Sequence, residues 1–490
     1  MCSDAFRVTI SDERHQIGKP LMPNERPNIL FVFPDQFRRQ AVGFLGEDPV
    51  VTPNLDRFAE ESCVLTHAVS TRPVCSPYRA MLLTGKYPHA NGVVGNCNSN
   101  TVQHGNYLSA EEVCLSDVLH AAGYHQGYIG KWHLDPPTED HNAYTEGPRG
   151  DGVVWDTYTP AERRHSFDFW HTYGCCDRHM SPHYWETDAA LHERIDVDEW
   201  SVKHETDAAI AYIRNDDGRQ RDPDKPFSLI ISHNPPHPPY AAVPKEYIRP
   251  YEAMTLPELA NRENFDPDAI GGEERARATL RHYFAAVTGV DEQFGSLLSA
   301  LNDEGLSENT IVVFTSDHGD MLGSHGLIGK DVWYDESFRV PMMVRWPWRI
   351  ATGPDDLLIG TPDLMPTLLG LVGEGDRVPD DVQGADMSPA LLGATVERPT
   401  SVLYYTSPPG RTEIGRRGVL THSHTFVVER GANGEEQTTL HDHAADPYQL
   451  ANVAGREPDL VGELESEVYR WCSRIDDPWL SASSSQSVGT

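Results

Sequence analysis

The segment Thr71–Gly85 (TRPVCSPYRAMLLTG) places a thiol and a guanidinium about one helical turn apart. Pro77 restricts Ser76 to extended conformations, and the run that follows has a helical pattern, so we expect Cys75 close to a helix N-terminus. The partial positive charge there favours a thiolate or a bound anion, and Arg79 could hold two oxygens of that anion. For Cys75 and Arg79 alone, a buried structural cysteine before an ordinary helix is the competing interpretation. With three residues between them, the pair does not match the longer spacing of a phosphatase loop.

Polar side chains follow each of four apolar runs that have the length and composition of buried parallel strands. The runs are Asn28–Phe33, Tyr124–Ile129, Phe227–Ser232 and Thr310–Thr315. The residues that follow them include Asp35 and Gln36, Lys131 and His133, His233 through His237, and Asp317 and His318. Ligands of open α/β sheets bind beyond the carboxyl ends of the strands. A single polar residue at such an end is ordinary loop chemistry, whereas four clusters at four ends predict one functional site.

Helical patterns lie between these strands, and strands that alternate with helices predict an α/β fold. The expected helices cover residues 53–61, 78–83, 116–122 and 276–303. We therefore predict a large, mostly parallel sheet sandwiched by helices.

The composition changes along the chain and predicts its division into units. A main domain is expected over 27–375, and a linker rich in Gly, Pro and Asp over 376–400. A smaller C-terminal α+β domain with an antiparallel sheet is expected over 401–480, with strands at 401–405 and 425–429 and a helix at 459–471. A polar N-terminal arm (1–26) and a disordered tail (481–490) complete the prediction.

The charge balance limits the partners of the protein. The sequence has 40 basic and 74 acidic residues, a net charge of −34, which disfavours nucleic acid and anionic membranes as partners. An anionic substrate then needs a local cluster of positive charge, and screening over about 8 Å makes such a cluster feasible. The sequence shows no secretory signal and no apolar run of the ~20 residues that a membrane span needs. Its eight cysteines are too few for a disulfide framework, so we expect a soluble cytoplasmic protein with free thiols.

Several of these segments together resemble the motifs of one family. Cys75-Ser76-Pro77-Tyr78-Arg79 with Leu83-Thr84-Gly85 is similar to the C-x-P-x-R…LTG signature of type I sulfatases in the alkaline phosphatase superfamily, which include arylsulfatases and glycan sulfatases. Gly123–His133 resembles their second signature. Further matches follow in family order and run from about Arg26 to Asn452: Asp35-Gln36, Pro236-His237, Asp317-His318-Gly319, Lys330, His441-Asp442 and Asp446-Pro447.

The resemblance implies a modified nucleophile. In this family a separate formylglycine-generating enzyme oxidises the motif cysteine to Cα-formylglycine, which exists as a hydrate. Carried over to Cys75, one hydroxyl of the hydrate would attack sulfur and expel the alcohol. Deprotonation of the other hydroxyl would then release sulfate and restore the aldehyde, so no water need attack sulfur.

The resemblance also implies a metal site. Asp35, Gln36, Asp317 and His318, together with the hydrate at position 75, would bind a divalent cation, which is calcium in most relatives. Oxygen-rich ligands suit such a hard cation. Gln36 and His318 stand where many members have Asp and Asn, which leaves Mg²⁺ or Mn²⁺ open.

The remaining catalytic roles follow from the same resemblance. His133 would be the base for sulfate release, and Lys131 would lie beside the hydrate. His237 would donate a proton to the leaving oxygen or bind sulfate. Lys330 would hold a sulfate oxygen, and Arg79 would stabilise the hydrate.

The residues that would contact the rest of the substrate are less clearly marked. The irregular segment 135–203 predicts loops over a cleft. Within it, Arg178, His179 and His183 are expected either to line a substrate pocket or simply to pack within the loop. Asn96 and Asn98, after the nucleophile helix, are candidates for contact with a sugar.

The resulting prediction is a sulfatase that acts on a small sulfated substrate. Polar and aromatic loops favour a sulfated saccharide, with aryl or choline sulfate as alternatives. A phosphonate monoester or phosphodiester hydrolase of the same superfamily is the first competing function. A catalytically silent protein that binds sulfated glycans is the second. The sequence leaves open the substrate, the linkage position, the oligomeric state and the native metal.

Overall fold

The computed structural model describes residues 26–480, and within them the chain forms two sheets. The strands of the larger sheet are β1 (Asn28–Val32), β2 (Cys63–Val69), β3 (His125–Lys131), β4 (Phe169–Tyr173), β5 (His183–Glu186), β6 (Ile195–Asp196), β7 (Phe227–Ser232), β8 (Thr310–Phe314), β9 (Met343–Arg345) and β10 (Gly353–Gly360). Their order is β10-β2-β9-β8-β1-β7-β3-β4-β5-β6. The predicted tail, and the predicted arm apart from Arg26, lie outside the described residues.

The middle of the large sheet is parallel and buried. β1 pairs in parallel with β7 and β8, so that Leu30 lies opposite Leu229 and Val312. β3 in turn pairs in parallel with β7 and β4. The four predicted strands are thus confirmed to within two residues at each end. β2 and β10, which pair in parallel beyond β9, escape the sequence pattern because CVLTHAV and GPDDLLIG mix polar with apolar residues.

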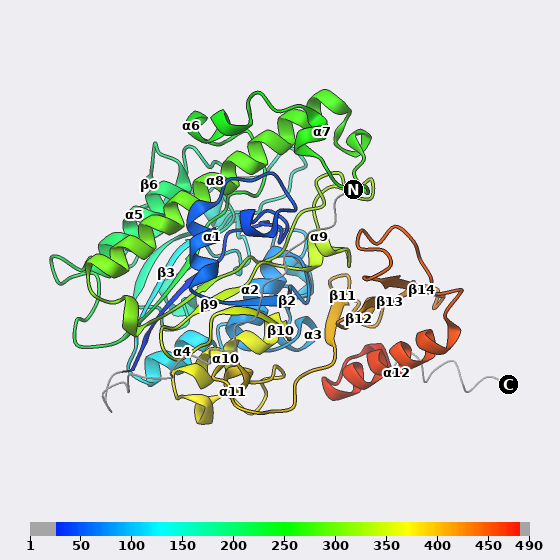
Figure 1. Ribbon diagram of the computed structural model, residues 1–490. Helices are drawn as coiled ribbons and strands as arrows, with labels where there is room; N and C mark the ends of the chain where they lie inside the picture. Colours follow the sequence, from blue (N-terminus) through cyan, green and yellow to red (C-terminus); the bar gives the residue numbers. More distant parts are fainter. Residues whose placement is uncertain (1–25, 481–490) are drawn as a thin grey trace.

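Helices cover both faces of this sheet (Figure 1). Leu30 of β1 packs in one apolar cluster with Phe294 of the long helix α8, whereas the neighbouring Phe31 packs with Leu82 of α2 in another. This alternation is what a strand buried on both faces requires. The helices on the first face are α1 (Pro53–Glu60), α5 (Ser201–Arg214) and α8 (Glu273–Asp303). Those on the second face are α2 (Cys75–Thr84), α4 (Leu115–Ala121), α10 (Leu364–Leu371) and α11 (Ser388–Leu391).

A second, antiparallel sheet follows in the C-terminal part of the chain, as predicted. Its elements are β11 (Val402–Thr406), β12 (Gly415–Leu420), β13 (His424–Arg430), β14 (Glu436–Asp442) and the covering helix α12 (Pro458–Arg474). The Arg417 and Asp477 side chains form a fully buried ion pair beneath α12, with Nη2 and Oδ1 2.8 Å apart. The guanidinium carbon lies 3.7 Å from the ring centre of Tyr405 and 5.0 Å from that of Trp479.

The segment 376–400 contains α11 and contributes to the main core, because Met387 and Leu391 pack with Leu368 of α10. The predicted linker and domain boundaries stay predictions. The remaining α-helices of residues 26–480 are short: α3 (Pro88–Asn91), α6 (Lys245–Ile248), α7 (Leu256–Leu259) and α9 (Asp335–Phe338).

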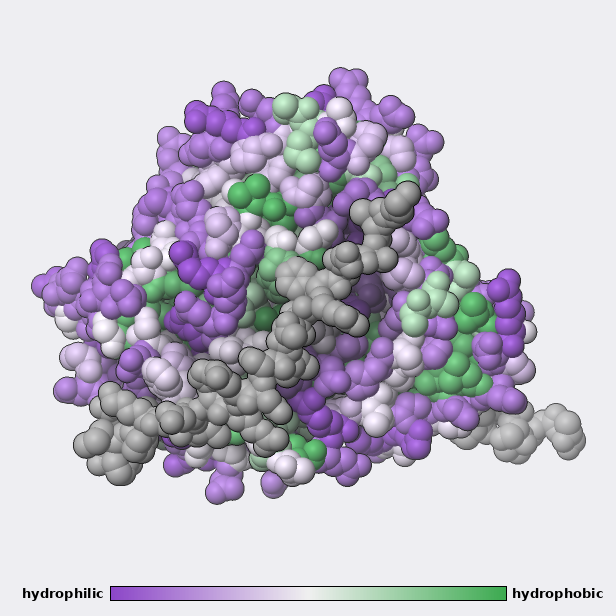
Figure 2. Space-filling model, viewed as in Figure 1, coloured by the Kyte–Doolittle hydropathy of each residue, from purple (hydrophilic) through white to green (hydrophobic). Residues whose placement is uncertain are grey.

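The face of the molecule drawn in Figure 2 is mainly hydrophilic. Figure 2 shows polar and charged residues over most of one face, with hydrophobic residues in separate small areas, in keeping with the net charge of −34. Among residues 26–480, no helix has both the length and the apolar character needed to cross a membrane.

Candidate active site

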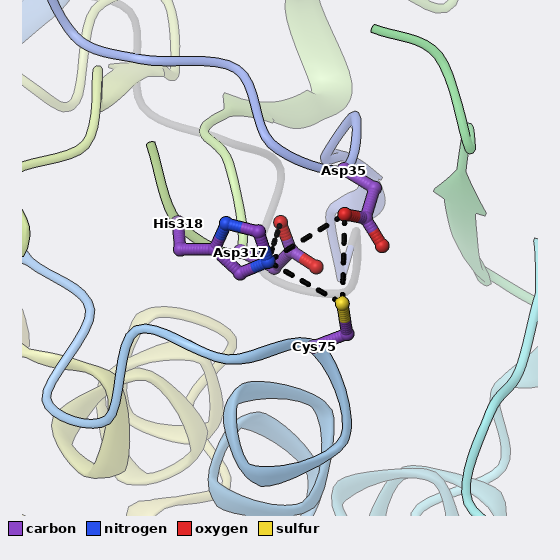
Figure 3. A group of neighbouring side chains, drawn as sticks. All are labelled: Asp35, Cys75, Asp317 and His318. Atoms are coloured by element: carbon purple, nitrogen blue, oxygen red, sulfur yellow. Dashed lines mark hydrogen bonds and ion pairs between the residues drawn. The ribbon is translucent and has the colours of Figure 1, made fainter. Parts of the chain in front are cut away.

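The carboxyl ends of the parallel strands meet around the N-terminus of α2. Asp35 follows β1, Lys131 ends β3, and Asp317 follows β8. Cys75 is the first residue of α2, as the position of Pro77 predicted. Figure 3 shows the side chains of Asp35, Asp317 and His318 converging on its sulfur. The strand order of the sheet causes this convergence, because β1 lies between β7 and β8, and β3 lies beyond β7.

Four of these side chains form a compact group that could hold a cation. The ligand atoms of Asp35, Cys75, Asp317 and His318 all lie within 4.8 Å of one another, and all four residues are buried. His318 Nε2 lies 3.5 Å from a carboxylate oxygen of each aspartate and 3.4 Å from Cys75 Sγ. Burial and the neighbouring Asp35 raise the pKa of Asp317. Two carboxylates held together away from water are the donors that a divalent cation would neutralise, so the residues present fit such an ion.

Gln36 lies beside this group, but its side chain already has partners. Its amide oxygen accepts from Lys330 Nζ at 2.9 Å, and its Nε2 donates to Asp320 at 2.6 Å. Its backbone N–H donates to Asp317 Oδ1 at 2.9 Å, and its φ of 67° is unusual for a residue with a side chain. Gln36 thereby positions Asp317 and Lys330, and its predicted role as a metal ligand stays a prediction.

Three cationic side chains, those of Lys131, Arg79 and Lys330, surround the carboxylates. Lys131 Nζ donates to Asp35 Oδ2 at 2.6 Å, and Arg79 Nη2 lies 3.1 Å from the same oxygen and 3.4 Å from Asp317 Oδ2. Lys131 is fully buried and Arg79 is 1% exposed. Within a low-dielectric interior these charges act strongly on their neighbours.

The cations also act on the residue at position 75. Lys330 Nζ lies 3.1 Å from Cys75 Sγ. Burial and Asp35 oppose ionisation of this thiol, but Lys131, Lys330 and His318 outweigh them and lower its pKa well below the usual value. An anionic group at position 75 is therefore stabilised.

His133 has the protonation pattern of a base. Its Nε2 lies 3.0 Å from the carbonyl oxygen of Cys97, which can only accept, so Nε2 carries the proton. Its Nδ1 is buried and has no hydrogen-bond partner among the described residues. Burial and Lys131 lower the pKa of this ring, which keeps it neutral, although the contact with Cys75 opposes the shift. Ser76 fixes the position of the residue, because its hydroxyl donates to the His133 carbonyl at 2.7 Å.

His237 follows β7 and lies at the edge of the cluster. Its Nδ1 donates to the carbonyl of Pro238 at 2.8 Å and lies 3.5 Å from Asp177 Oδ1. Burial, Lys131 and Lys330 lower the pKa of His237 well below its usual value. The nitrogen that remains, Nε2, is thus the one that a substrate could meet.

The predicted substrate residues have internal partners. Asn96 accepts from the backbone N–H of Ser76 at 3.1 Å, so it caps the first turn of α2. The side chain of Asn98 accepts from the backbone N–H groups of Asn100 and Thr101. Asn96 therefore supports the nucleophile segment, and Asn98 stabilises the turn that it forms with Asn100 and Thr101. Contact of either with a sugar stays a prediction.

The histidines of the predicted substrate loop also bond within the protein. His179 Nε2 lies 2.8 Å from the carbonyl of His237 and so braces that residue. His183 pairs with the buried Asp156 at 2.8 Å, and Arg178 Nη2 lies 2.9 Å from His183 Nδ1. The structure brings His179 next to the site, and places Arg178 and His183 in its supporting layer.

Sequence reasoning missed one residue that holds the site together. Asn234 accepts from Lys131 Nζ at 3.1 Å and donates to the carbonyl of Cys176 at 2.7 Å. It stands in the polar cluster that follows β7, so its position in the sequence pointed to the functional site. Its residue type carried none, because asparagine is common in loops.

Comparison with known proteins agrees with this geometry. The family described as Sulfatase matches residues 27–374, and the C-terminal family of N-sulphoglucosamine sulphohydrolase matches residues 323–470. An endo-4-O-sulfatase of Bacteroides thetaiotaomicron is 40% identical, with 93% of each chain covered. A ulvan-active sulfatase of Formosa agariphila is 33% identical, over 93% of this chain and 83% of that one.

A solved structure agrees as well. A chain from a study of glycosaminoglycan metabolism by Bacteroides thetaiotaomicron superposes with a TM-score of 0.87 at 39% identity, covering 94% of this chain and 98% of that chain. The protein belongs to the sulfatase family, within the alkaline phosphatase superfamily. It is an enzyme that hydrolyses sulfate esters. The family generally uses a metal ion and formylglycine.

Proposed function

We propose that this sulfatase removes sulfate from a sulfated saccharide, with formylglycine made from Cys75 as nucleophile and one divalent cation in the site. The names of two relatives, an endo-4-O-sulfatase and a ulvan-active sulfatase, support a saccharide substrate. A formylglycine-generating enzyme as maturation partner and a cytoplasmic location belong to the same proposal. The observation that carries it is the gathering of two aspartates, a histidine and three cationic side chains around position 75, all of them buried except the partly exposed Lys330.

The side chains divide into those that would hold the cation and those that would handle the sulfate group. Asp35, Asp317 and His318 would bind the cation, with Ca²⁺ favoured by the carboxylate oxygens. When bound, the cation supplies positive charge beside the nucleophile and the sulfate oxygens. Lys131 and Lys330 add to this charge, so the site attracts a sulfate monoester despite the acidic surface.

The two histidines would move the protons. His133 presents an unpaired, neutral Nδ1 toward position 75, which suits it to accept a proton from a hydroxyl there. His237 would lie against the leaving oxygen with its Nε2 and either donate a proton to it or hold the ester. Arg79 donates to Asp35 and stacks 5.0 Å from the ring centre of Phe33, which fixes its orientation beside the nucleophile.

The test begins with the state of residue 75. The protein is co-expressed with a formylglycine-generating enzyme, and mass spectrometry of the peptide 72–79 measures the conversion of Cys75. Sulfate release is then measured from nitrophenyl sulfate and from a panel of 2-O-, 4-O- and 6-O-sulfated oligosaccharides. Turnover that rises in proportion to conversion is the expected result.

Three other outcomes would contradict the proposal. Faster turnover of a nitrophenyl phosphodiester than of any sulfate ester would favour the phosphodiesterase activity of the superfamily. Binding of sulfated oligosaccharides without turnover by fully converted protein would indicate a silent glycan-binding protein. Equal turnover by unconverted protein would remove formylglycine from the mechanism.

A further inference from the structure

The catalytic centre is almost closed to solvent. Asp35, Lys131 and His318 are fully buried, and Cys75 is 1% exposed. At the edge of the site, the side chains of His237 and Lys330 are 14% and 16% exposed. A substrate therefore reaches position 75 between His237 and Lys330, and the residues that adjoin His237 and are more exposed line one side of its path.

Three such residues, Trp155, Arg149 and Asp177, form a continuous wall between His133 and His237. Trp155 is half-buried, and its ring centre lies 6.1 Å from that of His133. Arg149 stacks on Trp155 with its guanidinium carbon 5.3 Å from the ring centre. Its Nη1 lies 2.7 Å from Asp177 Oδ2, and Asp177 Oδ1 lies 3.5 Å from His237 Nδ1.

The topology explains why this wall stands at the mouth of the site. Asp177 follows β4, which runs parallel to β3, so it leaves the sheet at the same edge as Lys131. Trp155 lies in the loop between β3 and β4. The next residue, Asp156, holds this loop at the same edge, because its side chain accepts from the backbone N–H groups of Gly174 and Cys175 at 3.1 and 3.0 Å.

The chemistry of the wall suits a sugar ring rather than a second anion. The charge of Arg149 is balanced by Asp177 at 2.7 Å and by Glu146 at 3.7 Å, and Glu146 also balances Arg178 at 3.3 Å. Because its positive charges are paired, the wall offers fixed donors and acceptors but little net attraction for a carboxylate or sulfate. A partly exposed indole ring supplies an apolar surface for the C–H face of a pyranose, and its N–H has no acceptor among the described residues.

We propose that Trp155, Arg149 and Asp177 form the binding site for the sugar ring that carries the scissile sulfate. Trp155 stacks on the ring, while Arg149 and Asp177 bind its hydroxyl or acetamido groups. The inference rests on the proposed function, since it names the part of the protein that selects a saccharide over other sulfate esters.

The test measures binding, so it does not depend on turnover. Calorimetry on protein with Cys75→Ser compares a 4-O-sulfated glycosaminoglycan oligosaccharide with inorganic sulfate. Adding Trp155→Ala or Arg149→Met is expected to weaken the oligosaccharide at least tenfold, which equals about 1.4 kcal/mol. The affinity for inorganic sulfate should stay within twofold, because no hydrogen bond or ion pair among the described residues joins Trp155 or Arg149 directly to Lys131, Lys330 or His237.

Two further variants separate stacking from general damage to the fold. Trp155→Phe should restore most of the affinity, because a phenyl ring still offers a flat apolar face. Trp348→Ala is the matched control, since Trp348 is 59% exposed and follows β9, whose antiparallel course takes it to the opposite edge of the sheet. It should leave both affinities unchanged.

Several results would overturn the inference. They are an oligosaccharide affinity within twofold of the parent in Trp155→Ala, a parallel loss of sulfate affinity, or no oligosaccharide binding by the parent at all. Failure of the proposed function looks different: converted wild-type protein would release no sulfate while the wall variants still differed in binding.

Discussion

The pair formed by Asp35 and Lys131 allows a sharp test of the site's electrostatics. Without a bound metal ion, the site holds the buried cationic side chains of Arg79 and Lys131, the partly exposed Lys330, and two buried aspartates, Asp35 and Asp317. Asp35→Asn removes the carboxylate that pairs with both Lys131 and Arg79, and so leaves two buried cations short of a partner. Lys131→Met removes one of the excess positive charges, and Asp35 keeps Arg79 at 3.1 Å.

The two substitutions should therefore differ in cost. Removing one partner of a buried ion pair leaves the other charge without a partner and lowers the free energy of unfolding by about 3–5 kcal/mol. We expect a loss of this size for Asp35→Asn. Losing one charged hydrogen bond costs about 1.5–3 kcal/mol, which we expect for Lys131→Met. The double variant should be more stable than the sum of the single costs predicts, by about 1–3 kcal/mol.

Urea unfolding of chelator-treated protein, followed by circular dichroism, measures these free energies without interference from the bound ion. Elemental analysis of untreated protein provides a second readout, because Asp35→Asn should also lose the divalent cation. The reasoning is refuted if Lys131→Met destabilises the protein more than Asp35→Asn, or if the costs in the double variant simply add.

Three other predictions concern the nucleophile, the cation and the C-terminal sheet. Cys75→Ala should abolish sulfate release, and His133→Ala should lower it at least about 100-fold. Both variants should melt close to the wild-type temperature. Turnover retained by either variant would contradict the role assigned to that residue. Chelation should abolish turnover and added Ca²⁺ restore it. Burial raises the pKa of Asp317, so protons compete with the ion, and calorimetry should find weaker Ca²⁺ binding at pH 6 than at pH 8. Arg417→Met should leave the buried carboxylate of Asp477 without its partner and lower the free energy of unfolding in urea by about 3–5 kcal/mol. A loss below about 1 kcal/mol would show that this ion pair is not needed for stability.

The sequence predicted the parts of the site that regular structure dictates. Asp35, Lys131 and Asp317 follow apolar runs that could only be buried strands, and parallel strands bring their carboxyl ends to one edge. Pro77 and the helical pattern of the run after it predict that Cys75 lies at the start of a helix. In these cases local pattern and tertiary position have the same physical cause.

The rest depends on how irregular loops fold back, which no periodicity encodes. Trp155 and Asp177 lie in the loops between β3 and β5, and their contacts with His133 and His237 follow from loop packing. Asn96 has a structural role that its type did not reveal: the sequence predicts a sugar ligand, which stays a prediction, and the structure shows that its side chain caps α2. Polar residues of loops serve backbone groups as readily as ligands.

The burial of α2 has a consequence for the timing of maturation. Every residue of this helix is inaccessible in the folded chain, Cys75 included. If a separate enzyme oxidises Cys75, as we propose, it must therefore bind the segment while this is still an unfolded peptide, before β7 and β8 pack around it. Folding that outruns this oxidation traps a thiol out of reach. The active fraction of a preparation then depends on the rate of Cys75 oxidation relative to the rate of folding. Slower expression should therefore yield a larger fraction of active enzyme.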